Sequence, residues 1–248
     1  MPSPPLLRVA NLCKRFGQKV VLTNINFDVG QGEIFGIIGP SGVGKTTLLE
    51  CVVGFLRPES GEVALRVGEA WYSLLGRIGQ QVRRLFGFAS QYPSFYANLT
   101  VHENLHYFGT LYDVPNPRLL INIEHLLNLV GLGSEQATLA GNLSGGMQKR
   151  LEIACALVHN PPVLLLDEPT ADLDQLSRKN IWSLIKAVNA RGTTIIMASH
   201  FLQEMEQLCT RVAVLHRGSL ATIGTVEQLK KRYEGRSLGA VFERIVVA

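Results

Sequence analysis

One stretch of the chain has the residue types and spacing of a phosphate-binding loop, G-x-x-x-x-G-K-S/T: Gly39-Pro40-Ser41-Gly42-Val43-Gly44-Lys45-Thr46. Its glycines allow backbone N–H groups to converge on an anion, and a following helix N-terminus adds positive potential. We expect Lys45 to reach the β- and γ-phosphates of a nucleotide, and the Thr46 hydroxyl to bind Mg²⁺. A glycine-rich turn could match by accident, but this one lies between a predicted buried strand and a predicted helix, the context that the motif requires.

A second candidate for chemistry is a pair of acids, Asp167 and Glu168, at the end of the apolar run 163–167. Open α/β sheets bind ligands at the carboxyl ends of their strands. We expect Asp167 to hold Mg²⁺ through its waters and Glu168 to act as the general base that polarises the attacking water. Two acids at a strand end are also compatible with a solvated turn, but the phosphate loop in the same chain favours the catalytic interpretation.

The elements around these residues are predicted from apolar periodicity. Strands are expected where β-branched and apolar residues run together, and helices where apolar residues recur every three or four positions. Strands are predicted at 6–10, 20–29, 33–39, 85–90, 163–167, 193–199 and 211–215, and helices at 45–56, within 92–160 and at 175–190. The region 69–84 has no clear pattern. Strands that alternate with helices imply a parallel sheet covered on both faces. We therefore expect an α/β core with a small β layer near its start and a helical insertion.

Composition excludes several classes of protein. The 248 residues are 46% hydrophobic and 18% charged with a net charge of +4, so the chain can bury a core and is not intrinsically disordered. The sequence contains no uninterrupted run of about 18 or more apolar residues, which a bilayer span requires. We also expect no secretory leader. The four cysteines lack the spacing of a zinc site or a redox pair. Because the basic residues are scattered, we expect no nucleic-acid partner.

A third motif, Leu143-Ser144-Gly145-Gly146-Met147-Gln148-Lys149-Arg150, opens a predicted helix about twenty residues before Asp167. By itself the SGG stretch is also compatible with a helix start that has a flexible N-cap. With the other two motifs, however, the chain resembles the ATP-binding subunit of an ABC transporter over residues 6–232. In that family LSGG caps the ATP that is bound by a second subunit, and Met147 stands where many members have glutamine.

The resemblance implies roles for further residues. Phe16 matches an aromatic residue that stacks on adenine, Gln91 a glutamine that senses Mg²⁺, and His200 a histidine that contacts the γ-phosphate. Asp174 matches the loop that crosses the dimer interface, although Ala171-Asp172 departs from the usual Ser-Gly or Ser-Ala. The expected ATP contacts are Phe16, Gly39, Pro40, Ser41, Gly42, Val43, Gly44, Lys45, Thr46, Thr47, Ser144, Gly145, Gly146 and Asp174; the expected catalytic residues are Glu168, His200 and Gln91; the expected metal ligands are Thr46, Gln91 and Asp167.

The resemblance also implies a fold and partners. We expect one ABC ATPase domain, a P-loop NTPase core at 1–91 and 161–235 with a parallel central sheet, a small antiparallel β subdomain, an α-helical insertion at 92–160 and a tail at 236–248. The expected partners are a second ATPase subunit, identical or a close paralogue, and membrane permease subunits.

The expected location is the cytoplasmic face of the membrane, with the aromatic segment 92–96 near the permease contact. The stretch 99–115 and the tail resemble members that export drugs, lipids or polysaccharides. An importer ATPase and a soluble ABC ATPase of cluster assembly, repair or translation are the alternatives, and the cargo cannot be read from the residues.

Overall fold

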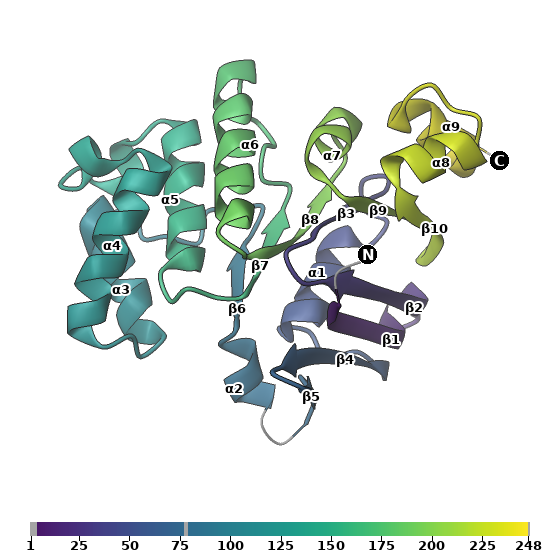
Figure 1. The fold of residues 1–248 in the computed structure, drawn as a ribbon, viewed down its shortest axis with the longest axis horizontal. Coiled ribbons are helices and arrows are strands. Elements are labelled where there is room, and N and C mark those ends of the chain that lie inside the picture. The colour runs from purple at the N-terminus through teal and green to yellow at the C-terminus, as the bar shows by residue number, and fades with distance from the viewer. Residues whose placement is uncertain (1–3, 77–78, 248) are drawn as a thin grey trace. The chain divides into compact units, whose positions relative to one another are not determined.

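The computed structural model describes residues 4–76 and 79–247. The described residues form two compact units, the first from Met1–Leu85 and Thr194–Ala248 and the second from Phe86–Thr193 (Figure 1). The predicted outer limits of the domain, residues 1 and 248, lie outside the described residues. Within those residues, no helix is both long and apolar enough to cross a membrane.

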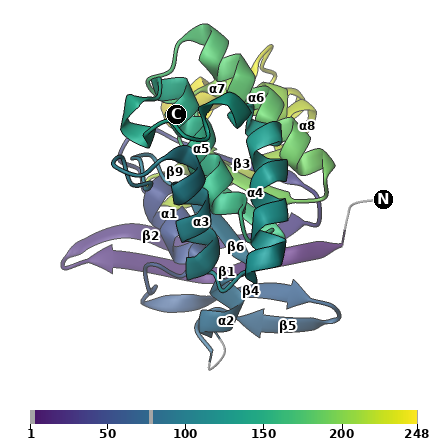
Figure 2. The same ribbon diagram turned by 90° about the vertical axis from the view of Figure 1, so that its left-hand side faces the viewer.

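The first unit contains a small antiparallel sheet, as expected from the sequence (Figure 2). Its strands have the order β2-β1-β4-β5 and are β1 (Pro5–Phe16), β2 (Lys19–Gly30), β4 (Ser60–Val67) and β5 (Ala70–Ser73). Strand β5 and the short helix α2 (Gly79–Arg83) account for most of the region in which no element was predicted.

Along 20–29, Val21, Thr23, Ile25, Phe27 and Val29 alternate with a more polar set and are therefore expected to share the buried face, but burial follows this alternation only from Ile25 onward. Ile25, Phe27 and Val29 are buried as expected, but Thr23 is exposed and Leu22 is buried. The phase changes at Asn24, whose φ of 49° places it in the left-handed region. Because successive side chains of a strand point to opposite faces, one such irregularity exchanges the two faces.

A second sheet in the first unit carries the phosphate loop. Strands β3 (Ile34–Ile38), β8 (Thr194–Ser199) and β9 (Arg211–His216) are parallel, as predicted, and β3 and β8 are buried along their whole length. The edge strand β10 (Ser219–Thr225), which was not predicted, runs antiparallel to β9. The unit's other helices are α1 (Lys45–Val53), α7 (Leu202–Leu208), α8 (Val226–Arg232) and α9 (Leu238–Val247), the last packed on α7 and α8. Helix α1 ends three residues earlier than predicted, because Gly54 adopts a left-handed C-cap.

The second unit is mainly helical, with one pair of parallel strands, β6 (Phe86–Ala89) and β7 (Val163–Asp167). Its helices are α3 (Val101–Leu111), α4 (Asn116–Val130), α5 (Gly145–Leu157) and α6 (Gln175–Ala190), with short 3-10 turns at Gly133–Glu135 and Ala140–Asn142. Helices α3 and α4 lie side by side (Figure 2). Helix α3 begins with a capping box, in which Thr100 and Glu103 each accept a backbone N–H of the other. The helices predicted within 92–160 are therefore confirmed.

Candidate nucleotide-binding site

The phosphate loop connects the buried strand β3 to α1. Gly44 is the N-cap of α1, with a φ of 111°, and the described residues provide neither a side-chain cap nor an acid in the first turn of this helix. The first N–H groups and the positive end of the helix dipole are thus directed at the loop. Gly39 is also required sterically, because a Cβ there would lie 2.6 Å from the carbonyl oxygen of Leu215.

Lys45 lies against the loop that precedes it. Its ammonium group donates to the carbonyl oxygen of Gly39 at 3.0 Å and to that of Pro40 at 3.3 Å, and the residue is only 7% exposed. These carbonyl contacts hold a positive charge inside the turn. The loop therefore combines converging N–H groups with a cation, which is the arrangement that binds a polyphosphate.

The β1–β2 hairpin packs on this loop and carries Phe16. A Cβ at Gly44 would lie 2.9 Å from Val21 of β2, so the hairpin and the loop make close contact. Phe16 is the last residue of β1, pairs with Lys19, and is 50% exposed. An exposed aromatic ring on the hairpin that contacts the phosphate loop is available to stack on a base.

Glu59 anchors the strand end before Phe16. One of its carboxylate oxygens accepts from the backbone N–H of Arg15 at 2.7 Å, and the other lies 3.3 Å from the ammonium of Lys14. The same ammonium lies 5.0 Å from the centroid of the Phe16 ring. Desolvation raises the pKa of the Glu59 carboxyl, but the hydrogen bonds from Arg15 and Lys14 outweigh it, so the net shift is downward. Glu59 was not identified from the sequence, because its contacts with Lys14 and Arg15 on the strand that ends at Phe16 are tertiary.

His200 also lies in the first unit. Ile38 of β3 pairs with Ser199 of β8, so the residues that follow them, Gly39 and His200, leave the sheet at neighbouring points of the same edge. His200 is exposed, and its ring lies 4.2 Å from that of Phe201. The first unit thus contains Phe16, the phosphate loop and His200.

The acid pair and Gln91 lie in the second unit. Asp167 is the last residue of β7 and is 1% exposed, and Glu168 follows with 7% exposure and a φ of 48°. A left-handed backbone in a residue other than glycine stores strain, which is common at functional sites. Leu166 pairs with Ala89, so Gln91 leaves β6 at the edge where the acid pair leaves β7. Carboxylate and hydroxyl oxygens, such as those of the buried Asp167 and of the exposed Thr46 in the first unit, are the hard ligands that Mg²⁺ prefers.

The LSGG motif forms the N-terminus of α5. Ser144 is the N-cap, and its hydroxyl accepts from the backbone N–H of Met147 at 3.4 Å. Ser144 and Gly145 are exposed, as contact with a second subunit requires. Gly146 has a further role within this chain, because a Cβ there would lie 2.7 Å from the hydroxyl of Ser177 on α6.

Asp174 is the N-cap of α6. It accepts from the N–H groups of Leu176 and Ser177 at 2.9 and 3.0 Å through one carboxylate oxygen. Hydrogen bonds from Ser177, first its side chain and then its backbone, hold the pKa of this carboxyl below its ordinary value. The carboxylate is therefore ionised and fixed at the start of the helix.

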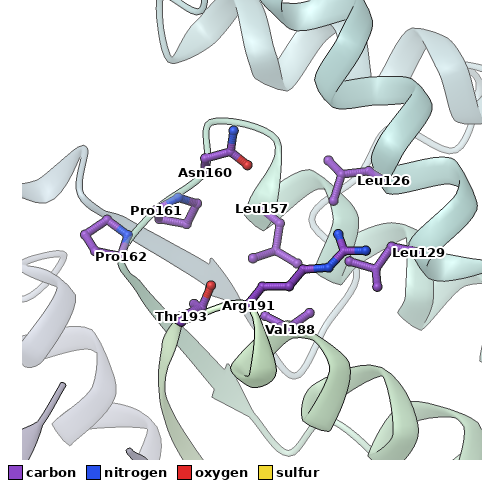
Figure 3. Close-up of a pocket in the computed structure, with 10 residues that line it drawn as sticks. Leu126, Leu129, Leu157, Asn160, Pro161, Pro162, Val188, Arg191 and Thr193 are labelled. Atoms are coloured by element: carbon purple, nitrogen blue, oxygen red, sulfur yellow. The ribbon is translucent and has the colours of Figure 1, made fainter. Parts of the chain in front are cut away.

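A cavity of about 340 Å³ in the second unit has no predicted site residue in its lining (Figure 3). Its lining includes the turn Asn160-Pro161-Pro162 before β7, and the side chains of Leu126, Val188 and Arg191. The turn Asn160-Pro161-Pro162 directly precedes the amino end of β7, and Val188 and Arg191 lie at the end of α6. The cavity is therefore distinct from the edge that carries Asp167 and Glu168.

The fold and these residues define an ATP-binding protein of the α/β class, and comparison with known proteins identifies its family. The model of the family described as "ABC transporter" matches residues 22–171. The linearmycin resistance ATP-binding protein LnrL of Bacillus subtilis is 32% identical over 94% of this chain and 73% of its own length. The Nod factor export ATP-binding protein I of Rhizobium sp. (strain N33) is 35% identical over 94% of this chain and 75% of its own.

Solved structures agree with this assignment. An ATP-binding subunit of an ABC transporter superposes with a TM-score of 0.85 and 26% identity, covering 97% of this chain and 99% of the other. Part of a CbiONQ transporter complex of Clostridium perfringens, cbiO1, gives a TM-score of 0.80 at 26% identity, covering 93% and 96% of the two chains. The chain belongs to the ABC transporter family. It is an ATP-binding subunit and an ATPase, as the resemblance in the sequence predicted.

Proposed function

We propose that this chain forms a dimer with a second ATPase subunit around two ATP molecules and powers export through membrane permease subunits. The observation that carries the proposal is the presence of a phosphate loop and an exposed LSGG helix start in one chain of this family. Export is favoured by relatives named for Nod factor export, for linearmycin resistance and, in Escherichia coli, as a probable multidrug transporter.

In this proposal the first unit binds the nucleotide. In residues 39–47 the backbone N–H groups, which Pro40 lacks, and the Lys45 ammonium surround the β- and γ-phosphates, and His200 contacts the γ-phosphate. Phe16 stacks on the adenine. The exposure of Phe16 and His200 supports these roles, because exposed rings in the unit that carries the phosphate loop are available to a nucleotide.

Hydrolysis in this proposal uses Glu168 as the general base that polarises the attacking water. Thr46, Asp167 and Gln91 are the residues that hold Mg²⁺, directly or through water. Mg²⁺, when bound, would neutralise negative charge on the β- and γ-phosphates. The burial of Asp167 and Glu168 supports these roles, because a charge acts more strongly on a reacting group where water is excluded.

Ser144, Gly145 and Gly146 are proposed to cap the ATP of the partner subunit, and Asp174 to lie at the dimer interface. The exposed N-terminus of α5 supports the first role, since a helix N-terminus attracts an anion. Asp174 is exposed at the N-cap of α6, so it is accessible to a second subunit, which supports the interface role. In this proposal ATP binding closes the two subunits on each other, and hydrolysis lets them open again.

We expect Phe16→Ala to weaken ATP binding about fivefold, because loss of the stacked ring costs about 1 kcal/mol. The measurement is equilibrium titration with ATP and, in parallel, with tripolyphosphate, which has no base. Affinity for tripolyphosphate should stay unchanged. Phe16→Tyr keeps the ring face and is the matched control. Equal weakening of both ligands would show that Phe16 supports the phosphate loop and does not contact the adenine.

The aromatic segment after Gln91 is the proposed contact with the permease. Tyr92 and Tyr96 are 77% and 48% exposed, and the Tyr96 ring packs edge-on against Tyr107 at 4.9 Å. We expect Tyr96→Ala to reduce the stimulation of ATPase activity by the permease and to leave the basal ATPase activity unchanged. Trp71→Ala on β5 is the control and should change neither the stimulation nor the basal activity. Stimulation equal to that of the native chain in the Tyr96 variant would exclude this contact.

The proposed partners and location are tested together by purification from the native host. The chain is tagged, the membranes are solubilised in mild detergent, and the proteins that co-purify are identified. We expect a polytopic membrane protein in near-equal amount, which would place the chain at the cytoplasmic face. Recovery with a non-membrane partner alone would contradict the transport function while leaving the ATPase assignment in place.

A further inference from the structure

A buried ion pair on α5 has no role in the mechanism described so far. The ammonium of Lys149 lies 2.8 Å from a carboxylate oxygen of Glu152, and the two residues are only 9% and 1% exposed. Burial raises the pKa of the Glu152 carboxyl, and the charge of Lys149 opposes that shift. A buried pair of this kind is costly to desolvate, and apolar residues often stabilise a fold equally well. Its presence therefore calls for a reason other than stability.

The remaining hydrogen bonds of the pair are directed at one segment, Ser90–Tyr92. The Lys149 ammonium donates to the carbonyl oxygens of Ser90 at 3.0 Å and of Gln91 at 3.4 Å. The Ser90 hydroxyl lies 3.3 Å from the second carboxylate oxygen of Glu152 and 2.5 Å from the carbonyl oxygen of Tyr92. These contacts join residues about sixty positions apart in the sequence. They secure the main chain at the point where it leaves β6.

The segment Ser90–Tyr92 contains Gln91. This residue is exposed, while its carbonyl oxygen accepts a hydrogen bond from the Lys149 ammonium. Helix α5, which provides the ion pair, begins at the N-cap Ser144. Lys149 follows Ser144 by five positions, about 7.5 Å along a helix axis. Lys149 therefore links the helix that begins with the LSGG motif to the main chain of Gln91.

We propose that Lys149 and Glu152 are positioning residues that tie the main chain of Gln91 to α5, so that Gln91 and the LSGG motif move as one body. This inference rests on the proposed function, in which Gln91 senses Mg²⁺ and Ser144 contacts the ATP of the partner. Its consequence is that engagement of the LSGG motif by the second subunit is coupled directly to the placement of Gln91.

The test is a double-mutant cycle on the purified chain. Lys149→Met and Glu152→Gln are combined so that neither charge is left buried and unpaired, and this pair of substitutions is measured with and without Gln91→Ala. For each variant, kcat, KM for ATP and the Mg²⁺ concentration for half-maximal activity are determined. We expect the paired variant to lower kcat about tenfold and to raise the Mg²⁺ requirement with little change in KM, because small misplacements of a positioned group are costly.

The decisive comparison is the variant with all three substitutions. If the ion pair acts through Gln91, adding Gln91→Ala lowers kcat no further than Gln91→Ala does alone, because coupled residues are not additive. Multiplicative losses, an unchanged Mg²⁺ requirement or a native kcat in the paired variant would overturn the inference. Ser90→Ala removes one tie without touching a charge, and we expect a smaller shift in the same direction.

Arg150 provides the matched control. It follows Lys149 on α5 and also binds main-chain oxygens, those of Val130 and Gly131, at 2.7 and 3.2 Å. Arg150→Met should therefore cost stability without changing the Mg²⁺ requirement, and its effect should add to that of Gln91→Ala. If Gln91→Ala has native activity, both the tie and the Mg²⁺ role fail. If Gln91→Ala is impaired and the paired variant is not, the tie alone fails.

Discussion

Replacement of Glu168 with glutamine is expected to lower ATP turnover by about two to four orders of magnitude, because the side chain keeps its size and loses its basicity. Glu168 directly follows the buried strand β7 and is 7% exposed. The glutamine fits the same space, so ATP binding should remain close to that of the native chain. Subunits that close on ATP and cannot hydrolyse it should accumulate as an ATP-dependent dimer.

Two measurements follow this result. Phosphate release gives the turnover, and size-exclusion chromatography with and without ATP and Mg²⁺ gives the fraction of dimer. Glu206→Gln is the control, because this carboxylate pairs with Lys230 and takes no part in the proposed chemistry. Hydrolysis at the native rate by the Glu168 variant would show that another group is the general base.

Ser144→Arg is expected to abolish the ATP-dependent dimer while leaving the ATP affinity of the monomer nearly unchanged. Ser144 is exposed at the N-terminus of α5, so an arginine can be accommodated in the monomer but fills the space of a partner's phosphate. The cost to the fold is limited to the N-cap, about 1 kcal/mol. A positive charge at a helix N-terminus adds a few tenths of a kcal/mol.

The dimer is best measured in a chain that also carries Glu168→Gln, which holds ATP without hydrolysing it. Ser144→Ala is the matched control, because it removes the cap to the N–H of Met147 without adding bulk. We expect Ser144→Ala to reduce dimer formation far less than Ser144→Arg. If Ser144→Arg weakens ATP binding by the monomer as much as it weakens the dimer, Ser144 serves the fold of its own subunit.

Much of the fold was predictable because its signals are local. The apolar runs that became β3 and β7 lie buried along their whole length, as uninterrupted runs in a parallel sheet should. Helix α6 occupies the predicted range 175–190. The phosphate loop was also predictable, because its motif requires glycines. In the structure Gly44 has a positive φ, and there is no room for a side chain at Gly39.

Other features were not predictable, because they depend on the backbone conformation of a single residue or on the direction in which two strands pair. The left-handed backbone at Asn24 exchanges the faces of β2, and no periodicity in the sequence marks it. Strand β10 turns back on β9, so the edge of an otherwise parallel sheet is antiparallel. Both features depend on backbone angles and on pairing partners, about which side-chain pattern carries little information.

The sequence by itself determined to which family the chain belongs and which acids follow a buried strand, and it predicted which residues bind phosphate. Only the tertiary structure decided which further side chains hold that chemistry in place. Glu59 binds the strand that carries Phe16, Ser177 packs closely on Gly146, and Lys149 binds the main chain of Gln91. Motifs can be recognised in a sequence because a continuous backbone sets the spacing of their residues. These contacts, in contrast, join segments 30 to 60 residues apart and exist only once the chain has folded.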